Sequence, residues 1–325
     1  MEDKVNRYRV LAIIKGLLAL CLLGYIVYIL EVRTIVHSLK EARLSFIFLA
    51  LSLLPINIGL ELLKWHTMQR KLSSTVTLAE SLGAILSGYS LGILTPARMG
   101  EHVGRALFHK HPDRWQVTFL SFIDRMHNLT CYIGLGIPAL LFFIKTRTIE
   151  QHELWYPILL SGAVVFGILL MLILSPRFAA LLFTRTLPEK VRHHVLPVIA
   201  SYSRRDALKL GGLSVLRYAV FTTQFFLLLL AFAPDIPLRE AYAGIAAIYF
   251  TKSALPSMTF MDLGIREGAA IFFLGSLGIP RVAAFNASLM IFMFNLLLPA
   301  LVGIPTLFHL HLPAAAREFF NRSAV

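Results

Sequence analysis

The sequence is poor in charged side chains. Lys, Arg, Asp and Glu make up only 15% of its 325 residues, whereas hydrophobic residues make up 57% and the mean hydropathy is +0.71. So little polar sequence cannot coat a water-soluble globule of this length. The composition excludes an ordinary soluble protein, and it predicts an all-α polytopic membrane protein.

Cysteine is scarce, and the signatures of common catalytic sites are missing. Cys21 and Cys131 both lie within apolar segments, where a cysteine packs as a small hydrophobic side chain, so a disulfide framework is not expected. The chain has no P-loop, no nucleophile elbow and no paired-carboxylate metal motif, and its two His-x-His pairs lack further ligands. We therefore expect no metal, no cofactor and no enzymatic activity.

Long polar intervals are missing too. The longest, 176–209, is too short for a folded soluble domain, so we predict one transmembrane domain over residues 1–325. Within it, 176–209 is expected to be a cytosolic connection with one amphipathic helix. A helix needs about 20 apolar residues to cross a bilayer. Apolar segments lie at about 10–30, 44–63, 78–96, 117–144, 155–175, 210–233, 241–261, 265–279 and 283–309.

Positive charge is in excess, with a net charge of +13. Its distribution argues against nucleic acid as a partner, because the basic residues gather in the loops 64–71, 98–114 and 177–209. The positive-inside bias places such loops in the cytoplasm. We therefore predict a multi-pass protein of the cell inner membrane with both termini in the cytoplasm.

Segment 78–96 separates two of these basic loops, so it cannot cross the membrane fully if both loops face the cytoplasm. Gly83, Gly88 and Gly92 also weaken helix continuity along it. Broken helices are tolerated at membrane depth where they are buried in protein or line a cavity. We predict that 78–96 and the later segment 241–261 are re-entrant broken helices, alongside about six full spans.

The two halves of the chain match one another. Three full spans separate the re-entrant elements, and an odd number makes the copies antiparallel, so we predict an inverted internal repeat with halves at about 44–175 and 210–310. The matching pairs, offset by 160 to 167 residues, are Pro96 with Pro256, Glu101 with Glu267, Asn128 with Asn295, and the Gly-Ile-Pro runs at 136–138 and 303–305.

Charges and helix breakers cluster at corresponding places in both halves, at 94–105 and 255–267. Charges are costly at membrane depth, so this clustering predicts a binding site. Arginine side chains suit phosphate oxygens, and carboxylates balance them or bind a cationic headgroup. The predicted substrate-binding residues are Arg98, Glu101, Arg105, Asp124, Arg125, Lys252, Arg266 and Glu267. The predicted hinge residues are Pro96, Gly100, Pro256 and Gly264.

Spacing leaves the role of the first cluster open. Glu101 and Arg105 lie four residues apart, in the order that favours an ion pair on one helix face, and this pair serves either headgroup binding or only the stability of the turn. Arg266 and Glu267 are adjacent and are not expected to share a face, so we expect unequal half-sites. Lys252 either adds a cation to the second half-site or extends to the membrane interface.

Other polar residues within apolar segments give weaker signals. Glu61 and Lys64 are three residues apart, and we expect them to neutralise one another at the inner interface. Asn128 and Asn295 are expected to hydrogen-bond to neighbouring helices. Arg217 fits either a cavity or a contact with headgroups near the cytoplasmic face.

Several short runs of the sequence together suggest a family. They are 95–101 with Arg105, Ile-Asp-Arg at 123–125, Leu-Lys-Trp at 63–65, and Leu-Pro at 255–256 with Gly264 and Glu267. Through these runs the chain resembles, from about Leu11 to Leu310, the membrane-domain family of lysylphosphatidylglycerol synthases, also described as flippase-like. In two-domain members, the resemblance implies, such a module moves an aminoacylated lipid made by a cytosolic transferase domain. The sequence ends at Val325, so we expect no transferase domain here.

These features together predict lipid translocation, in which a charged phospholipid or lipid-linked headgroup moves between leaflets through a cavity between two inverted half-sites. The expected partners are membrane lipids, either anionic, aminoacylated or polyprenyl-linked, with a second copy of the chain or a lipid-synthesis enzyme as further candidates. Two other interpretations stay open. One is a non-transporting regulator of lipid or envelope-glycan synthesis, and the other is a membrane transferase that acts on a lipid phosphate.

Overall fold

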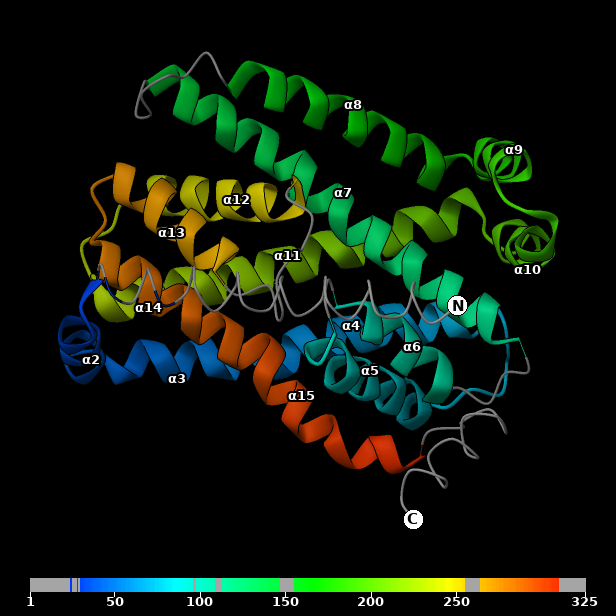
Figure 1. Cartoon of the computed structure of the whole chain (residues 1–325), viewed down its shortest axis with the longest axis horizontal. Helices are drawn as coiled ribbons and strands as arrows, with labels where there is room; N and C mark the ends of the chain where they lie inside the picture. Colours follow the sequence, from blue (N-terminus) through cyan, green and yellow to red (C-terminus); the bar gives the residue numbers. More distant parts are fainter. Residues whose placement is uncertain are drawn as a thin grey trace, which may run out of the picture.

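The computed structural model of the protein describes residues 30–95, 98–108, 113–146, 155–254 and 264–309, together with Gly24 and Tyr28. Nearly all of these residues are helical, and none of them lies in a strand (Figure 1). The prediction of an all-helical, multi-pass membrane protein is confirmed. Five helical stretches in the described ranges are long and apolar enough to span a membrane, namely Leu44–Gln69, Arg114–Thr146, Trp155–Leu174, Arg204–Phe232 and Arg281–His309.

The helices follow one another with short connections, and the predicted first span at 10–30 lies almost entirely outside the described residues. The elements are α2 (Val32–Lys40), α3 (Leu44–Ser52), α4 (Leu54–Gln69), α5 (Leu78–Ile93), α6 (Met99–Phe108), α7 (Arg114–Thr146), α8 (Trp155–Leu174), α9 (Pro176–Thr186), α10 (Glu189–Ala200), α11 (Arg204–Phe232), α12 (Leu238–Ala254), α13 (Ile265–Ser276), α14 (Arg281–Phe292), the π-helix η4 (Met293–Leu297), α15 (Leu298–Gly303) and the 3₁₀-helix η5 (Ile304–His309).

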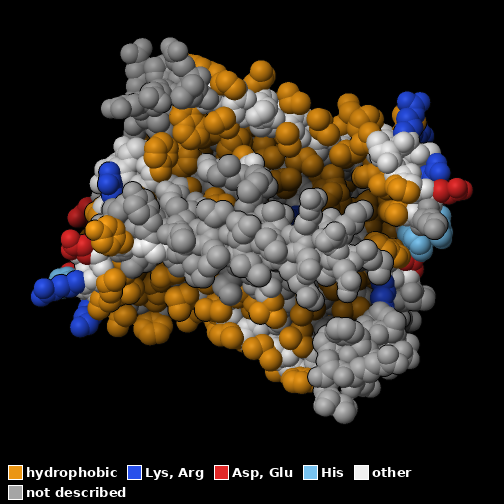
Figure 2. All heavy atoms as spheres, viewed as in Figure 1, with side chains coloured by type: hydrophobic (Ala, Val, Ile, Leu, Met, Phe, Trp, Pro, Cys, Tyr) orange, Lys and Arg blue, Asp and Glu red, His pale blue; other side chains and the backbone are white. Residues whose placement is uncertain are grey.

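The surface has the pattern of a protein surrounded by lipid. Between the left and right ends of the face in Figure 2, the coloured side chains are mostly hydrophobic, whereas charged side chains gather at the two ends. The long helices α7, α8 and α11 run between these two ends in Figure 1. The described part of the molecule therefore presents an apolar belt with a polar rim on each side, as a membrane-spanning bundle does.

Residues at the start of two helices explain where these helices begin. At the start of α5, the Glu80 N–H donates to Thr77 Oγ1 at 3.2 Å, and the Thr77 N–H donates to Glu80 Oε2 at 3.0 Å. Ser203 and Asp206 make the same reciprocal pair at the start of α11. Each pair satisfies backbone donors that a helix leaves without partners at its first turn.

Helices α5 and α6 form a tight antiparallel hairpin. A Cβ atom added to Gly104 would lie 2.6 Å from the Ser87 carbonyl oxygen, and one added to Gly100 would collide with the Leu91 carbonyl. The two backbones are thus in direct contact, which only glycine permits at these positions. Segment 78–96 therefore does not continue as one long helix, since the chain turns back after Ile93. Pro96, the predicted hinge at this turn, lies outside the described residues.

Helices α12 and α13 form a second hairpin. Gly244 of α12 faces the Leu274 side chain of α13, and both helices pack into an apolar cluster that includes Phe225, Phe250 and Phe273. The connection between the two helices, with the predicted hinge Pro256, lies outside the described residues. In Figure 1 this hairpin lies towards the left of the molecule, and α5 and α6 lie towards the right.

The connection between the two halves contains two helices, α9 and α10, instead of the single helix predicted for 176–209. Val195 and Ile199 of α10 pack with Ala179 of α9 in a small apolar cluster of their own, which explains why both segments are helical. His194 lies 2.6 Å from Asp113 at the start of α7. Partial burial raises the pKa of Asp113, but hydrogen bonds from His194 and from the Gln116 N–H outweigh it, so this pKa lies below its usual value.

Candidate functional site

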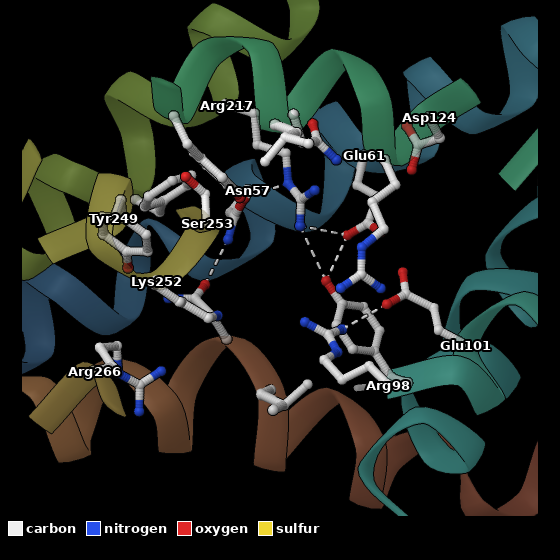
Figure 3. Close-up of a pocket in the computed structure, with 18 of the residues that line it drawn as sticks. Asn57, Glu61, Arg98, Glu101, Asp124, Arg217, Tyr249, Lys252, Ser253 and Arg266 are labelled. Carbon is white, nitrogen blue, oxygen red and sulfur yellow. Dashed lines mark hydrogen bonds and ion pairs between the residues drawn. The ribbon is translucent and has the colours of Figure 1, made fainter. Parts of the chain in front are cut away.

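A cavity of about 310 Å³ lies among the membrane helices, and both halves of the chain line it. Figure 3 shows Arg98 and Glu101 on one side of this cavity, and Lys252 and Arg266 on the other. The lining residues from the first half are Asn57, Glu61, Tyr89, Arg98, Glu101, His102, Ser121, Asp124, Arg125, Asn128, Leu129 and Tyr132. Those from the second half are Arg217, Phe221, Tyr249, Lys252, Ser253, Arg266, Ile291, Phe292, Asn295 and Leu296.

Arg105 is the centre of the charge network on the first side. Its guanidinium, which has 0% exposure, donates to Glu61 Oε1 at 2.5 Å, to Glu101 Oε1 at 2.7 Å and to Asp124 Oδ2 at 3.0 Å. The three carboxylates come from α4, α6 and α7, so one side chain joins three helices. The group also lies over the Trp65 ring, 4.7 Å from its centroid. A planar guanidinium with several donors suits such a buried junction.

Lys64 pairs with a different carboxylate from the one that its spacing suggests. We expected it to neutralise Glu61 at the inner interface, but its ammonium lies 2.8 Å from Asp124 Oδ1 and donates to Asn128 Oδ1 at 2.9 Å. Lys64 is 1% exposed, so it does not reach the membrane interface. The expectation of a local Glu61–Lys64 pair is wrong, because α7 offers Lys64 three oxygen acceptors.

Glu61 instead pairs with Arg217, which the sequence left without an assigned place. Arg217 Nη2 donates to Glu61 Oε2 at 2.7 Å, and Arg217 Nε donates to Asn57 Oδ1 at 2.9 Å (Figure 3). The Tyr89 hydroxyl donates to the same Glu61 oxygen at 2.5 Å. The only sequence signal for Glu61 and Arg217 is that each is a charge inside an apolar segment.

Arg98 closes the first side of the cavity at the start of α6. Its guanidinium lies 2.9 Å from Glu101 Oε2 and 5.5 Å from the centroid of the Tyr89 ring. The backbone φ of Arg98 is 55°, in the left-handed region that side-chain-bearing residues rarely adopt. This conformation lies where the chain turns from α5 into α6, so the turn itself orients the side chain. The predicted ion pair of Glu101 with Arg105 is present as well.

The second side contains an ion pair between adjacent residues. Arg266 lines the cavity and Glu267 lies behind it, but Arg266 Nη2 lies 2.5 Å from Glu267 Oε1. Glu267 lies in the first turn of α13, where its side chain folds back and accepts the Gly264 N–H at 2.7 Å. This fold-back brings its other oxygen next to Arg266, which also donates to Ser288 Oγ at 3.1 Å. This local pair differs from the inter-helix network around Arg105 on the first side.

The family model of the lysylphosphatidylglycerol synthase TM region matches residues 12–303 of the chain. The chain belongs to this family. Comparison with curated proteins gave no match. Membership in the lysylphosphatidylglycerol synthase membrane family relates the chain to a membrane domain of lipid synthesis or translocation.

In this family member, six of the eight predicted substrate-binding residues line the cavity, and their role in binding stays a prediction. Those six are Arg98, Glu101, Asp124, Arg125, Lys252 and Arg266, whereas Arg105 and Glu267 lie behind the wall and hold lining residues in place. Asn128 and Asn295 accept hydrogen bonds from Lys64 and Asn57, so both join neighbouring helices as expected. Across the described ranges, no group of three or more His, Cys, Asp or Glu side chains is placed to hold a metal ion.

Proposed function

We propose that the protein moves a charged phospholipid or lipid-linked headgroup between the leaflets of the cell inner membrane, without changing it chemically. The observation that supports this proposal is the charged cavity inside an apolar helical bundle. A headgroup that leaves water needs hydrogen bonds and opposite charges in exchange, because an unpaired phosphate or ammonium in hydrocarbon is strongly disfavoured. Arginine, lysine, carboxylate, amide and phenol groups all line the cavity.

The arrangement of the two hairpins supports a path between the leaflets. In Figure 1, α4 ends and α7 begins at the right end of the molecule, so the hairpin between them opens to that end. The chain enters α12 from the left end and leaves α13 towards the same end, so the second hairpin opens the opposite way. Two broken elements that enter from opposite sides and face a shared cavity are the layout of many transporters.

Equivalent contacts between the halves support the inverted repeat. Gly136 of α7 packs against Phe250 of the second hairpin, where an added Cβ would collide with its side chain. Gly303, which follows Gly136 by 167 residues, packs against the Leu86 carbonyl and Ser90 of the first hairpin. Phe250 follows Ser90 by 160 residues. Each half thus contributes the span that follows its own hairpin to the hairpin of the other, at positions that the predicted register relates.

The basic connections support a cytoplasmic assignment for one end. Lys71 contacts Asp206 at 2.8 Å and His194 contacts Asp113 at 2.6 Å, so the segments after α4, before α7 and around α10 and α11 gather together. They lie at the right end of Figure 1. By the positive-inside bias this end faces the cytoplasm. We place both termini on this side.

The test is lipid exchange in vesicles. The purified protein is reconstituted in phosphatidylcholine vesicles that contain a trace of fluorescent phosphatidylglycerol, and quenching of the outer leaflet reports exchange. We expect the wild-type protein to accelerate exchange, and Arg98→Ala and Glu101→Gln to abolish it, because both side chains line the cavity and pair with one another. Arg185→Ala is the matched control, since Arg185 is exposed on α9, away from the cavity.

Two results would count against this proposal. Exchange at the vesicle background rate with folded wild-type protein would favour the regulator interpretation. Normal exchange in both cavity variants would place the path elsewhere in the chain. Mass spectrometry of the recovered lipids separates translocation from transferase activity, because translocation leaves every lipid mass unchanged.

A further inference from the structure

We propose that α2 is a membrane-surface helix, which lies in the plane of the bilayer at the end opposite the basic connections and binds the phospholipid interface there. This interaction surface is separate from the cavity, and the proposal does not depend on lipid translocation. The partner is the lipid surface itself, with acyl chains against an apolar stripe of α2 and headgroup phosphates against a basic stripe. The sequence pattern of α2, its contacts and its position support this inference.

The residues of α2 separate into two stripes. On a helix with 3.6 residues per turn, Val32, Val36 and Leu39 line up along one side. The basic stripe beside them consists of Arg33, His37 and Lys40. Separate apolar and basic faces are typical of helices that lie in a membrane interface, with the apolar side chains about 5–10 Å into the boundary between headgroups and acyl chains.

The apolar stripe stays exposed in the described part of the molecule. Val32, Val36 and Leu39 are 61%, 43% and 41% exposed, whereas Ile35 on the neighbouring side of α2 is 8% exposed. Large apolar side chains that are exposed next to one another mark a contact with lipid or with another protein. The position and the orientation of α2 favour lipid.

Contacts with α14 fix the rotation of α2 about its own axis. Ile35 belongs to an apolar cluster with Leu30 and Phe285. Asn286 Nδ2 also donates to the Ile35 carbonyl oxygen at 3.4 Å. The protein therefore holds α2 by one edge, and the apolar stripe cannot turn inwards unless these contacts are lost.

Helix α2 lies at the level where three spans begin or end. The span that contains α3 begins at Leu44, shortly after the last residue of α2. The Arg43 N–H donates at 2.9 Å to the carbonyl oxygen of Ala231, which is next to the last residue of α11. Phe285 and Asn286, which contact α2, lie in the first half of α14. The ends of spans lie where hydrocarbon gives way to headgroups, so α2 lies at that boundary.

The axis of α2 runs across the spans. In Figure 1, α2 is seen almost end-on at the left end of the molecule, whereas α7, α8 and α11 extend across the picture. A helix at right angles to the spans lies in the plane of the membrane. The left end is opposite the basic connections, so α2 contacts the non-cytoplasmic leaflet in the orientation proposed above.

The basic stripe suits the headgroup region. Arg33, His37 and Lys40 are all exposed. Long basic side chains can lay their stems on apolar surface while the charge reaches the headgroups, and the phosphate of any phospholipid accepts their hydrogen bonds. Glu31 and Glu41 flank the helix, and Glu41 lies 3.2 Å from His37. These carboxylates offset part of the positive charge, so we expect attachment to zwitterionic phosphatidylcholine as well as to anionic lipid.

Spin labels along α2 test the proposal with the full chain. In a background with Cys21→Ser and Cys131→Ala, a single cysteine substitution is made at each of the six positions of the two stripes. The labelled proteins are reconstituted in phosphatidylcholine vesicles and exposed to oxygen, which concentrates among acyl chains, or to a water-soluble nickel chelate. We expect oxygen to relax the labels at 32, 36 and 39 more, and the chelate to relax those at 33, 37 and 40 more. A label at Val164, exposed in the middle of α8, gives the signal of a lipid-facing position.

Three results would overturn the proposal. A stronger response to the chelate at all six positions would place α2 in water. A weak response to both relaxants at 32, 36 and 39 would show that another protein segment covers the apolar stripe. Dipolar broadening between labels at position 36 of different molecules would identify a second copy of the chain as the partner instead of lipid.

A charge in the apolar stripe provides the matched comparison. Val36→Glu places a carboxylate against the acyl chains, where an unpaired charge is costly, so we expect the label at 39 to shift from the oxygen response towards the chelate response. Thr34→Glu adds the same carboxylate to the exposed side of α2 that faces away from the apolar stripe, and it should leave the label at 39 unaltered. The thermal midpoint in detergent verifies that both variants are folded. An unaltered label at 39 in folded Val36→Glu would contradict insertion of the stripe into the bilayer.

Discussion

The two hairpins hold their charges in different ways. Beside α5 and α6, three carboxylates from three helices bind four cations, and Arg105 alone contacts all three. Beside α12 and α13, Glu267 pairs with its own neighbour Arg266 and with the Gly264 backbone. The first network ties α4, α6 and α7 together by charge, whereas the Arg266–Glu267 pair is joined to α14 by the neutral Ser288 hydroxyl. The comparison indicates a rigid first wall and a second wall whose charges are less tied to neighbouring helices.

The packing of the two hairpins also differs, and again the first hairpin is the more tightly constrained. Gly100 and Gly104 bring the backbones of α5 and α6 into contact, but Gly244 of α12 meets the end of the flexible Leu274 side chain. Backbone atoms cannot move aside as a side chain can. The first hairpin therefore tolerates less change, in its packing and in its charges.

The strongest test of this comparison is Arg105→Gln against Arg266→Gln. The first change leaves three buried carboxylates without their shared cation, and we expect it to cost about 3–5 kcal/mol of stability. The second leaves one carboxylate that still accepts the Gly264 N–H and the Ser288 hydroxyl, so we expect a loss of about 1–3 kcal/mol. Thermal unfolding in one detergent measures both. Equal losses would show that the first network is no more important to the fold than the second pair.

A smaller effect separates the packing of the hairpins. We expect Gly104→Ala to destabilise the protein by about 1–3 kcal/mol, because the added methyl group meets the Ser87 carbonyl. We expect Gly244→Ala to be nearly neutral, since Leu274 can shift and alanine favours the helix by about 1 kcal/mol over glycine. The same unfolding assay compares them, and a larger loss for Gly244→Ala would reverse our interpretation.

The smallest effect separates structure from binding at Tyr89 and Tyr249, which the predicted repeat relates. The Tyr89 hydroxyl donates to Glu61 and accepts from Arg217, so Tyr89→Phe should cost about 1 kcal/mol of stability. The Tyr249 hydroxyl, 160 residues later, makes no hydrogen bond to the residues that the structure describes. We expect Tyr249→Phe to leave stability unchanged and to slow phosphatidylglycerol exchange. Normal exchange in Tyr249→Phe would remove this hydroxyl from the proposed site.

The sequence was sufficient for the helical class and for much of the cavity wall. Charges such as Arg98 and Asp124 stand out in an apolar chain because burial without a partner is costly there. The partners of Glu61 could not be predicted, since Arg105 and Arg217 lie 44 and 156 residues further along the chain. Spacing reports only neighbours on one helix, so it suggested Lys64 instead.

The pairing of adjacent charges was also not apparent from spacing. Glu267 occupies the first turn of α13 and folds back onto Gly264, which brings its other oxygen next to Arg266. The second helix between the halves was missed as well, because α9 and α10 depend on contacts with one another that no single segment contains. The missing information was a tertiary contact for Glu61 and for α9 with α10, and a local fold-back at the start of a helix for Glu267.

The separation of Glu61 from its partners also matters during synthesis of the protein. A ribosome adds about 5–20 residues per second, so the 156 residues between Glu61 and Arg217 take about 8–30 s. During this time α4 is already made, while its carboxylate lacks one of the two cations that neutralise it in the finished molecule. Until α11 arrives, Glu61 needs water or a proton in place of this cation, because an unpaired charge is costly away from water. The order of synthesis thus makes α11 the last helix needed to neutralise Glu61.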